Sequence, residues 1–257
     1  MSSGPSLLAA AIQYRPLWGK VDHNRTRLLF LVHSAAKLGA ELIVLPEMCT
    51  SGYIFADRES VLSHCEPRSG PSVQLFQREA VRLGVTLCFG WPERDPETDL
   101  LYNSAAVCFP DGKTIFYRKR LLYEADETWS APGDTPYPEW TSQQGLKCTL
   151  GICMDLNDDG FIQHLKEKEC RVVAFPTNWI DQGFKVWNYW AWRLDGTGSC
   201  LVAANRYGTE ETTRFSGDSA ILDGRTLLGW TEATGDNVVA AYIPLEPTPF
   251  QPDEDQD

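Results

Sequence analysis

Apolar residues in this chain gather into short runs that alternate with amphipathic segments. Short continuous apolar runs are typical of strands buried on both faces of a sheet, whereas apolar positions three or four residues apart predict helices that cover such a sheet. The pattern predicts strands at residues 7–14, 41–47, 85–91, 101–110, 112–121, 146–156, 171–179 and 199–208. It predicts helices between them at residues 22–40, 71–84, 161–169 and 186–194.

Turn and capping residues mark several of these boundaries. Asp22 or Asn24 is expected to cap the first helix, and Gly39 is expected to stop it. Gly84 is expected to close the second helix. The Pro-Asp-Gly sequence at 110–112 predicts a hairpin between the strands on its two sides.

The second half of the chain adds a long connection and a final antiparallel part. Residues 123–142 are polar and rich in turn formers, and connections of this length are often functional. From Thr212 onward, FSGDSAILDG, TLLGW and NVVAAYI predict two or three antiparallel strands. Buried strands separated by helices, with hairpins among them, favour an α/β fold in which sheets pack on each other and helices lie outside.

The domain organisation is expected to be simple. No linker, low-complexity segment or internal repeat divides the 257 residues, a length that suits one large domain. We therefore predict a single domain at residues 1–246. Residues 247–257 end in PDEDQD and predict an acidic, solvated tail.

Composition argues against several classes of function. A net charge of −12 without a Lys/Arg cluster argues against a nucleic-acid partner. No signal peptide precedes the first apolar run, and no apolar stretch reaches the roughly 18 residues of a membrane span, so no membrane partner is expected. Eight cysteines without a CxxC pair indicate a reducing compartment and a cytoplasmic location. The four histidines lack HxxxH and HExxH spacing, so no metal site is predicted.

Three predicted strands end in groups that can do chemistry. ELIVLPE ends at Glu47, TIFYRK ends at Lys119, and LKCTLGIC ends at Cys153. Ligands and catalytic groups of α/β folds favour the carboxyl ends of strands. We therefore expect these three side chains to converge.

Each of the three groups suits a step of carbonyl chemistry. The thiolate of Cys153 can attack a carbonyl carbon, and a helix beginning near Asn157 is expected to lower the thiol pKa through its dipole. Glu47 can take the thiol proton and pass it to the departing amine, and an apolar surround is expected to raise the pKa of its carboxyl. Lys119 and the backbone N–H of Met154 can stabilise the oxyanion.

Structural interpretations and a rival chemistry stay open at this point. Cys153 can be a packing residue, Glu47 a loop acid, and Lys119 part of a solvated basic strand edge. A cysteine–histidine hydrolase is the rival. It is disfavoured because His164 is expected on a helix that faces away from Cys153, and His64 is expected in a polar loop.

Several segments, in order, resemble motifs of the nitrilase superfamily, the carbon–nitrogen hydrolases. AAAIQ resembles its first strand, LPEMCTSGY its glutamate motif, YRKRLL its lysine motif and GICMDLN its cysteine motif. FPTNW and VAANRYG resemble two later signatures, so the resemblance covers most of the chain. It implies that Glu47 is the general base, Lys119 the second catalytic residue and Cys153 the nucleophile. It also implies a four-layer αββα sandwich, frequently a homodimer, and no cofactor.

The resemblance is less exact at two further positions. The family carries a second glutamate before a Pro-Gly turn, which orients the lysine and the substrate. Here the segment is DETWSAPG, and Glu127 is our prediction for that role, with Asp126 one place away as the alternative. Many members carry a RARAxEN-like run before the VAANR strand, whereas this chain has RLDGTGS at 193–199. The acidic and asparagine contacts expected there are therefore in question.

The substrate class follows from the same likeness. GICMDLN and NYWAWRL most resemble the protein N-terminal amidase branch, which deamidates N-terminal Asn or Gln of peptides. The implied substrate is an amide or a peptide N-terminus. The alternatives are a small-molecule omega-amidase or carbamoylase, a nitrilase acting on C≡N, and a non-catalytic binding protein.

Aromatic and amide side chains near the predicted strand ends are candidates for binding. Tyr53, Asn178 and Trp179 are expected to line a substrate pocket, with ordinary loop packing as the alternative. The tryptophan-rich segment at 184–194 predicts either aromatic core packing or a subunit contact or pocket wall.

Overall fold

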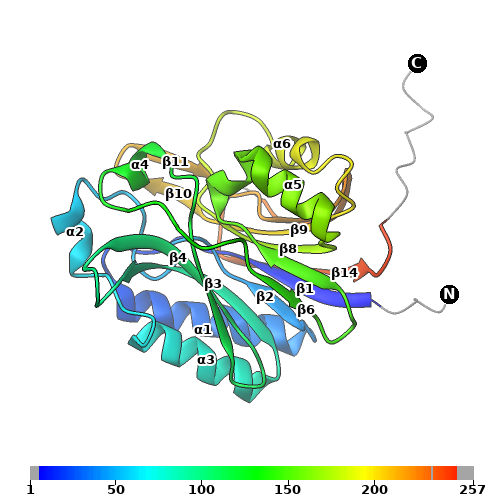
Figure 1. Cartoon of the computed structure of the whole chain (residues 1–257), viewed down its shortest axis with the longest axis horizontal. Coiled ribbons are helices and arrows are strands. Elements are labelled where there is room, and N and C mark those ends of the chain that lie inside the picture. The colour runs from blue at the N-terminus through cyan, green and yellow to red at the C-terminus, as the bar shows by residue number, and fades with distance from the viewer. Residues whose placement is uncertain (1–5, 233, 248–257) are drawn as a thin grey trace.

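Two six-stranded sheets stack face to face at the centre of the computed structural model, which describes residues 6–232 and 234–247 (Figure 1). In spatial order, the first sheet contains β14 (Asn237–Pro244), β1 (Ser6–Gln13), β2 (Leu42–Val44), β3 (Thr86–Arg94), β4 (Leu101–Cys108) and β5 (Thr114–Arg118). The second contains β13 (Thr226–Trp230), β12 (Ala220–Asp223), β9 (Cys200–Asn205), β8 (Val172–Thr177), β7 (Lys147–Leu150) and β6 (Glu139–Thr141). The predicted strands are therefore present, and the expected hairpin joins β4 to β5.

Helices cover the outer face of each sheet (Figure 1). α1 (Val21–Lys37) and α3 (Pro71–Leu83) pack on the first sheet, and α5 (Asp159–Lys168) and α6 (Val186–Arg193) pack on the second. The predicted α/β class and four-layer αββα sandwich are confirmed.

The first strand shows why its sequence is apolar at almost every position. In β1, Leu7, Ala9 and Ala11 belong to the core between the two sheets. The intervening Ala10 and Ile12 belong to the core beneath α1 and α3. Because successive side chains of a strand point to opposite faces, a sheet buried on both faces requires continuous apolar runs.

The start of α1 differs from the prediction. The helix begins at Val21 after Lys20, with no side-chain cap, so both predicted caps are wrong. Asn24 instead lies buried inside the helix, where its Oδ1 accepts hydrogen bonds from the Tyr14 hydroxyl (2.8 Å) and the Leu17 N–H (2.9 Å). Its amide group is used to fix the loop between β1 and α1 rather than the helix end.

The predicted helix ends agree better. Gly39 has φ +91°, two residues beyond the end of α1, and Gly84 ends α3 in the left-handed conformation at φ +70°. Glycine adopts this conformation without the steric penalty that a Cβ imposes. The prediction that Gly84 closes the second helix is therefore confirmed.

Several short elements had no clear periodic signal. They are α2 (Arg58–Leu62), α4 (Glu124–Glu127), a 3₁₀-helix (Cys153–Asn157), β10 (Tyr207–Glu210) and β11 (Thr213–Ser216). β10 and β11 form a separate two-stranded hairpin. The last strand, β14, pairs with β1 and therefore forms one edge of the first sheet. It does not belong to the second sheet.

Of the tryptophans in helix α6, one packs in the core and another is exposed to solvent. Trp190 is fully buried in the core, as the packing interpretation predicts. Trp192 is 60% exposed, and Trp187 is half-buried beside the ring of Trp230. The outer face of α6 is therefore aromatic and open to solvent.

Two further expectations concern the chain as a whole. Of the predicted tail at 247–257, only Pro247 lies within the described residues, and the single domain at 1–246 stays a prediction. Within residues 6–232 and 234–247, no helix is long and apolar enough to cross a bilayer.

Candidate active site

Glu47, Lys119 and Cys153 lie just beyond the ends of β2, β5 and β7 and are brought together by the packing of the two sheets. The Lys119 Nζ donates a hydrogen bond to Glu47 Oε1 at 2.7 Å, and both side chains are fully buried. Cys153 is buried close enough for the charges of Glu47 and Lys119 to act on its thiol. The expected convergence of the three strand ends is therefore present.

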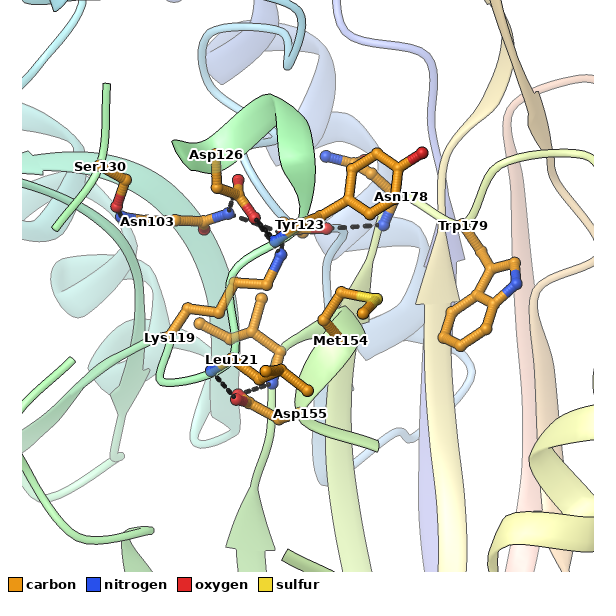
Figure 2. A network of polar contacts seen from close by, with 12 residues as sticks. Asn103, Lys119, Leu121, Tyr123, Asp126, Ser130, Met154, Asp155, Asn178 and Trp179 are labelled. Carbon is orange, nitrogen blue, oxygen red and sulfur yellow. Dashed lines mark hydrogen bonds and ion pairs between the residues drawn. The ribbon is translucent and has the colours of Figure 1, made fainter. Parts of the chain in front are cut away.

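The second acid beside the lysine is Asp126 and not Glu127. Lys119 Nζ donates to Asp126 Oδ2 at 2.6 Å, and Asp126 is fully buried (Figure 2). Glu127 is exposed on α4 and makes no contact with Lys119. Because successive residues of a helix point about 100° apart, these neighbours cannot both face the lysine. The structure thus corrects the placement predicted for Glu127.

Asn103 was missed by the sequence analysis. It lies in β4, and its Nδ2 donates both to Glu47 Oε1 (2.7 Å) and to Asp126 Oδ1 (2.9 Å) (Figure 2). Together, Glu47, Asn103, Lys119 and Asp126 form what we call the lysine network. The available signal was an asparagine within the mostly apolar run LYNSAAVC, because a fully buried amide needs hydrogen-bond partners.

Burial and the paired charges set the proton affinities of the lysine network. Burial raises the pKa of Glu47, as predicted; the ammonium of Lys119 opposes this rise and the charge of Asp126 adds to it. Burial would lower the pKa of Lys119, but the charges of Asp126 and Glu47 outweigh that effect and hold it well above its ordinary value. Lys119 therefore holds its proton more tightly than a free lysine, and Glu47 binds a proton more readily than a free carboxylate.

The thiol of Cys153 differs from the expectation of a lowered pKa. Burial, followed by the charge of Glu47, raises its pKa to about 12; Lys119 and the nearby polar groups of Thr177 and Asn178 oppose the rise only in part. Only a five-residue 3₁₀-helix follows the cysteine, so the dipole of a long helix is not available to lower the pKa. A thiol with this pKa keeps its proton near neutral pH.

The backbone at the cysteine is held in an uncommon conformation. Cys153 has φ +44°, in the left-handed region that side chains with a Cβ rarely adopt. Asp155 secures this turn: its Oδ2 accepts from the Ile152 N–H (2.9 Å), and its Oδ1 accepts from the Leu121 N–H (3.0 Å). The buried Asp155 therefore links the cysteine turn directly to the loop after Lys119 (Figure 2).

Close backbone approach around the lysine network requires glycine at two positions. A Cβ on Gly90 would lie 2.7 Å from Glu47 Cα, and a Cβ on Gly133 would lie 2.0 Å from the Arg118 carbonyl oxygen. Gly133 also donates its N–H to the Lys119 carbonyl at 2.7 Å. The Pro-Gly turn at 132–133 therefore packs directly on the strand end that presents the lysine.

A cavity of about 280 Å³ opens beside the cysteine. Its lining contains all four residues predicted for the substrate pocket, namely Tyr53, Met154, Asn178 and Trp179, together with Cys153. It also contains Tyr123, Asn157, Ile180 and Gln182, which the sequence analysis did not predict as lining residues. A larger hollow of about 420 Å³ beside Asp195 and Arg225 includes none of these side chains.

The backbone of Asn178 is hydrogen-bonded to the lysine network, and Asn178 also lines the cavity. Its N–H donates to Glu47 Oε2 at 2.8 Å (Figure 2). Its side-chain Oδ1 and Nδ2 are buried and have no partner among the described residues. Because buried amide groups are nearly always hydrogen-bonded, this side chain is available to a ligand in the cavity.

The two histidines of the rival chemistry lie elsewhere. His164 packs against the ring of Tyr137 at 5.3 Å, and His64 packs against Trp18 at 5.4 Å. Neither lines the cavity beside Cys153. Among residues 6–232 and 234–247, no group of three or more His, Cys, Asp or Glu could hold a metal ion.

Fold and site together define a hydrolase that acts on carbon–nitrogen bonds. The chain belongs to the carbon–nitrogen hydrolase family, whose model matches residues 8–246. It is 27% identical to the protein N-terminal amidase of Schizosaccharomyces pombe, over 90% of this chain and 98% of that relative. It is 29% identical to a nitrilase of Pyrococcus abyssi, over 92% of this chain and 89% of that relative.

A solved structure extends the likeness in fold. The crystal structure of an N-terminal amidase with an Asn-Glu-Ala peptide superposes with a TM-score of 0.77 at 19% identity, covering 93% of this chain and 97% of that chain. At this identity the likeness shows the fold, the four-layer sandwich described above.

The assignment of the second acid can be tested with adjacent variants. Replacing Asp126 with asparagine removes a charge that holds Lys119, and we expect kcat/KM for amide hydrolysis to fall by about a hundredfold. Replacing Glu127 with glutamine changes an exposed side chain, and activity should stay within about twofold of the unsubstituted protein. The measurement is ammonia release under identical conditions. A larger loss for Glu127→Gln than for Asp126→Asn would contradict the assignment.

The raised thiol pKa predicts how Cys153 reacts with alkylating agents. A free thiol with a pKa near 9 reaches its maximal alkylation rate soon above that pH, because the thiolate is the reactive form. With a pKa of about 12, the rate at Cys153 should keep rising nearly tenfold per pH unit between pH 8 and pH 10. Peptide mass mapping after timed iodoacetamide exposure measures this rate. A plateau below pH 9 would show that the thiol is more acidic than its burial indicates.

Proposed function

We propose that this hydrolase is a cysteine-dependent amidase that releases ammonia from a carboxamide through a thioester acyl-enzyme. One observation carries the proposal: the buried carboxylate of Glu47 and ammonium of Lys119 are 2.7 Å apart and act on the thiol of Cys153, which lines the cavity. A nucleophile, a base of raised pKa and a fixed cation are the groups that acyl transfer needs.

In the first half of the proposed reaction, Cys153 Sγ attacks the carboxamide carbon while its proton passes to Glu47. The carbonyl oxygen becomes an oxyanion, held by the ammonium of Lys119 and the backbone N–H of Met154. Glu47 then gives the proton to the amide nitrogen. The C–N bond breaks, ammonia leaves, and the acyl group stays on sulfur as a thioester.

In the second half, Glu47 takes a proton from a water molecule that attacks the thioester carbon. The same two donors hold the second oxyanion. The C–S bond breaks, the proton returns to sulfur, and a carboxylic acid is released. Asp126 and Asn103 act by orienting Lys119 and Glu47, because Asp126 accepts a hydrogen bond from Lys119 and Asn103 donates one to Glu47.

For the substrate, we propose an N-terminal Asn or Gln residue of a peptide. The protein N-terminal amidase relative spans nearly the whole chain, and a fold relative was crystallised with a peptide that begins with Asn. The cavity of about 280 Å³ lies at the small end of ligand pockets, which suits one terminal residue with the rest of the peptide outside.

Charge separates this proposal from the small-molecule alternatives. No arginine or lysine belongs to the lining of the cavity. A substrate with a free carboxylate, such as an omega-amide of an oxo acid or a carbamoyl amino acid, would be desolvated there without a cationic partner. A peptide α-ammonium can instead face the rings of Tyr123 and Trp179, and the unpaired amide of Asn178 can hydrogen-bond the substrate.

The decisive experiment is an ammonia-release screen with matched substrates. Peptides that begin with free Asn or Gln should be hydrolysed, and the same peptides acetylated at the N-terminus should react at least about tenfold more slowly. Carboxylate-bearing omega-amides and carbamoyl amino acids should be poor substrates. Ammonia from nitriles but not from amides would identify a nitrilase, and no reaction of any compound would favour a binding protein.

Two further proposals concern the setting of the enzyme. All eight cysteines are free in the structure, which supports the reducing cytoplasm as its location. A homodimer remains a proposal from the family resemblance. Sedimentation of the purified protein tests it.

A further inference from the structure

The hairpin of β10 and β11, residues Tyr207–Ser216, contacts two loops that both contribute to the lining of the cavity. One loop, residues 48–55, follows Glu47 and carries Tyr53. The other, residues 178–182, carries Trp179 and Ile180. The hairpin contacts the first loop through a buried carboxylate, and it contacts the second loop through its backbone and a surface ion pair.

A buried carboxylate holds the first loop. Glu210 Oε1 accepts hydrogen bonds from the Tyr53 N–H (2.7 Å) and the Ile54 N–H (2.5 Å). Glu210 is 7% exposed, and its Oε2 accepts from Arg206 Nη2 at 2.7 Å. Gly52 makes the approach possible: it has φ +95°, and a Cβ there would lie 2.9 Å from Glu210 Oε2.

The backbone of β11 holds the second loop. The Ser216 N–H donates to the Trp179 carbonyl at 2.8 Å, and the Asp181 N–H donates to the Arg214 carbonyl at 2.9 Å. An antiparallel bridge pairs Ile180 with Phe215. An ion pair at the surface adds to these backbone contacts, because Arg214 Nε lies 3.0 Å from Asp181 Oδ2.

Rings and a buried cation complete the link between the two loops. Phe215 meets the ring of Tyr53 edge to face at 6.0 Å, and the guanidinium of Arg206 lies 4.1 Å above the centre of Phe215. Arg206 is 1% exposed, and its Nε and Nη1 have no hydrogen-bond partner among the described residues. The hydrogen bond to Glu210 therefore fixes the orientation of the guanidinium, and it holds the carboxylate of Glu210 in place.

We propose that Glu210 is a positioning residue for the active site. Its carboxylate fixes the Tyr53 side of the cavity relative to the Trp179 side, and Arg206 holds that carboxylate in place. Glu210 touches neither Cys153 nor the lysine network in the described contacts and acts only through the backbone of residues 53 and 54. The kinetic consequence rests on the proposed amidase function, whereas the structural consequence does not.

The test compares two double variants that both remove the buried ion pair. In Arg206→Met with Glu210→Gln, the glutamine oxygen can still accept from the N–H groups of Tyr53 and Ile54. In Arg206→Met with Glu210→Met, no acceptor remains. The glutamine variant also buries an unpaired amide N–H, so a general loss of stability would penalise it more than the methionine variant. Faster exchange or lower activity in the methionine variant would therefore be due to the lost contact with the loop.

Hydrogen exchange measures the loop, and kinetics measures its consequence. The amides of Tyr53 and Ile54 should exchange about tenfold faster in the methionine variant than in the glutamine variant, while exchange in α3 stays equal. On the best peptide substrate of the screen, kcat/KM should be about tenfold lower in the methionine variant, mainly through KM. Alkylation of Cys153 by iodoacetamide should agree within about twofold between them.

The outcomes are distinguishable. Equal exchange at Tyr53 and Ile54, or unequal exchange with equal kcat/KM on an active peptide, overturns the positioning role. If the unsubstituted protein hydrolyses no amide, the proposed function fails. The exchange result then still decides whether Glu210 fixes the cavity.

Discussion

Replacing Cys153 with alanine is expected to reduce kcat for ammonia release by about ten-thousandfold or more. The sulfur forms the covalent bond in the proposed reaction, and loss of a nucleophile removes the pathway rather than a single stabilising contact. Ammonia release from the best substrate of the screen measures the effect. In the unsubstituted protein, acid quenching during turnover should leave an acyl group on the peptide that contains Cys153.

A second buried cysteine supplies the control. Cys170 is 1% exposed in the core between the sheet and α5 and lies outside the cavity. Cys170→Ala should lower the free energy of unfolding by about 1 kcal/mol through lost packing and keep kcat within about twofold. Full turnover by Cys153→Ala, or an acyl group found on another residue, would overturn the proposed mechanism.

The sequence predicted the layers and the three strand-end residues because both depend on strong, local signals. Runs such as LLAAAIQ are apolar throughout because β1 is buried on two faces, and the carboxyl ends of strands in such a fold present side chains to one region. Glu47, Lys119 and Cys153 each end a predicted strand, so their common location followed from the fold.

The residues that support these three could not be predicted with the same certainty. The choice between Asp126 and Glu127 depends on the phase of a four-residue helix, which shows no periodicity in sequence. Asn103 gives one weak sign, a polar residue within an apolar strand. Glu210 comes two residues after VAANRYG, outside the motif. Its contact with Tyr53 joins residues 157 positions apart, which the local sequence does not reveal.

The prediction of a lowered pKa for the Cys153 thiol was wrong for a different reason. The prediction of a lowered value assumed a regular helix whose dipole begins at the cysteine. The chain instead forms a short 3₁₀-helix, and burial beside Glu47 raises the pKa to about 12. Electrostatic effects at a strand end depend on depth of burial, which the local sequence does not specify.

Replacing Lys119 should lower both stability and catalysis. Lys119→Met keeps a long unbranched side chain but leaves the buried carboxylates of Glu47 and Asp126 without their cation. We expect the free energy of unfolding to fall by about 3–5 kcal/mol, because breaking a buried ion pair leaves an uncompensated charge. We also expect kcat/KM to fall by about a thousandfold, because the oxyanion loses its charged partner. Chemical denaturation and ammonia release measure the two effects separately.

A compensating substitution separates the two roles of the lysine. In the double variant Lys119→Met with Asp126→Asn, one buried charge is removed together with its partner, and Glu47, whose pKa is already raised by burial, can be protonated. Much of the lost stability should therefore return, while kcat/KM should stay near that of Lys119→Met, since no ammonium remains to stabilise the oxyanion. A double variant that regains activity along with stability would show that Lys119 serves only to neutralise buried acids. The oxyanion would then have to be stabilised by backbone N–H groups alone.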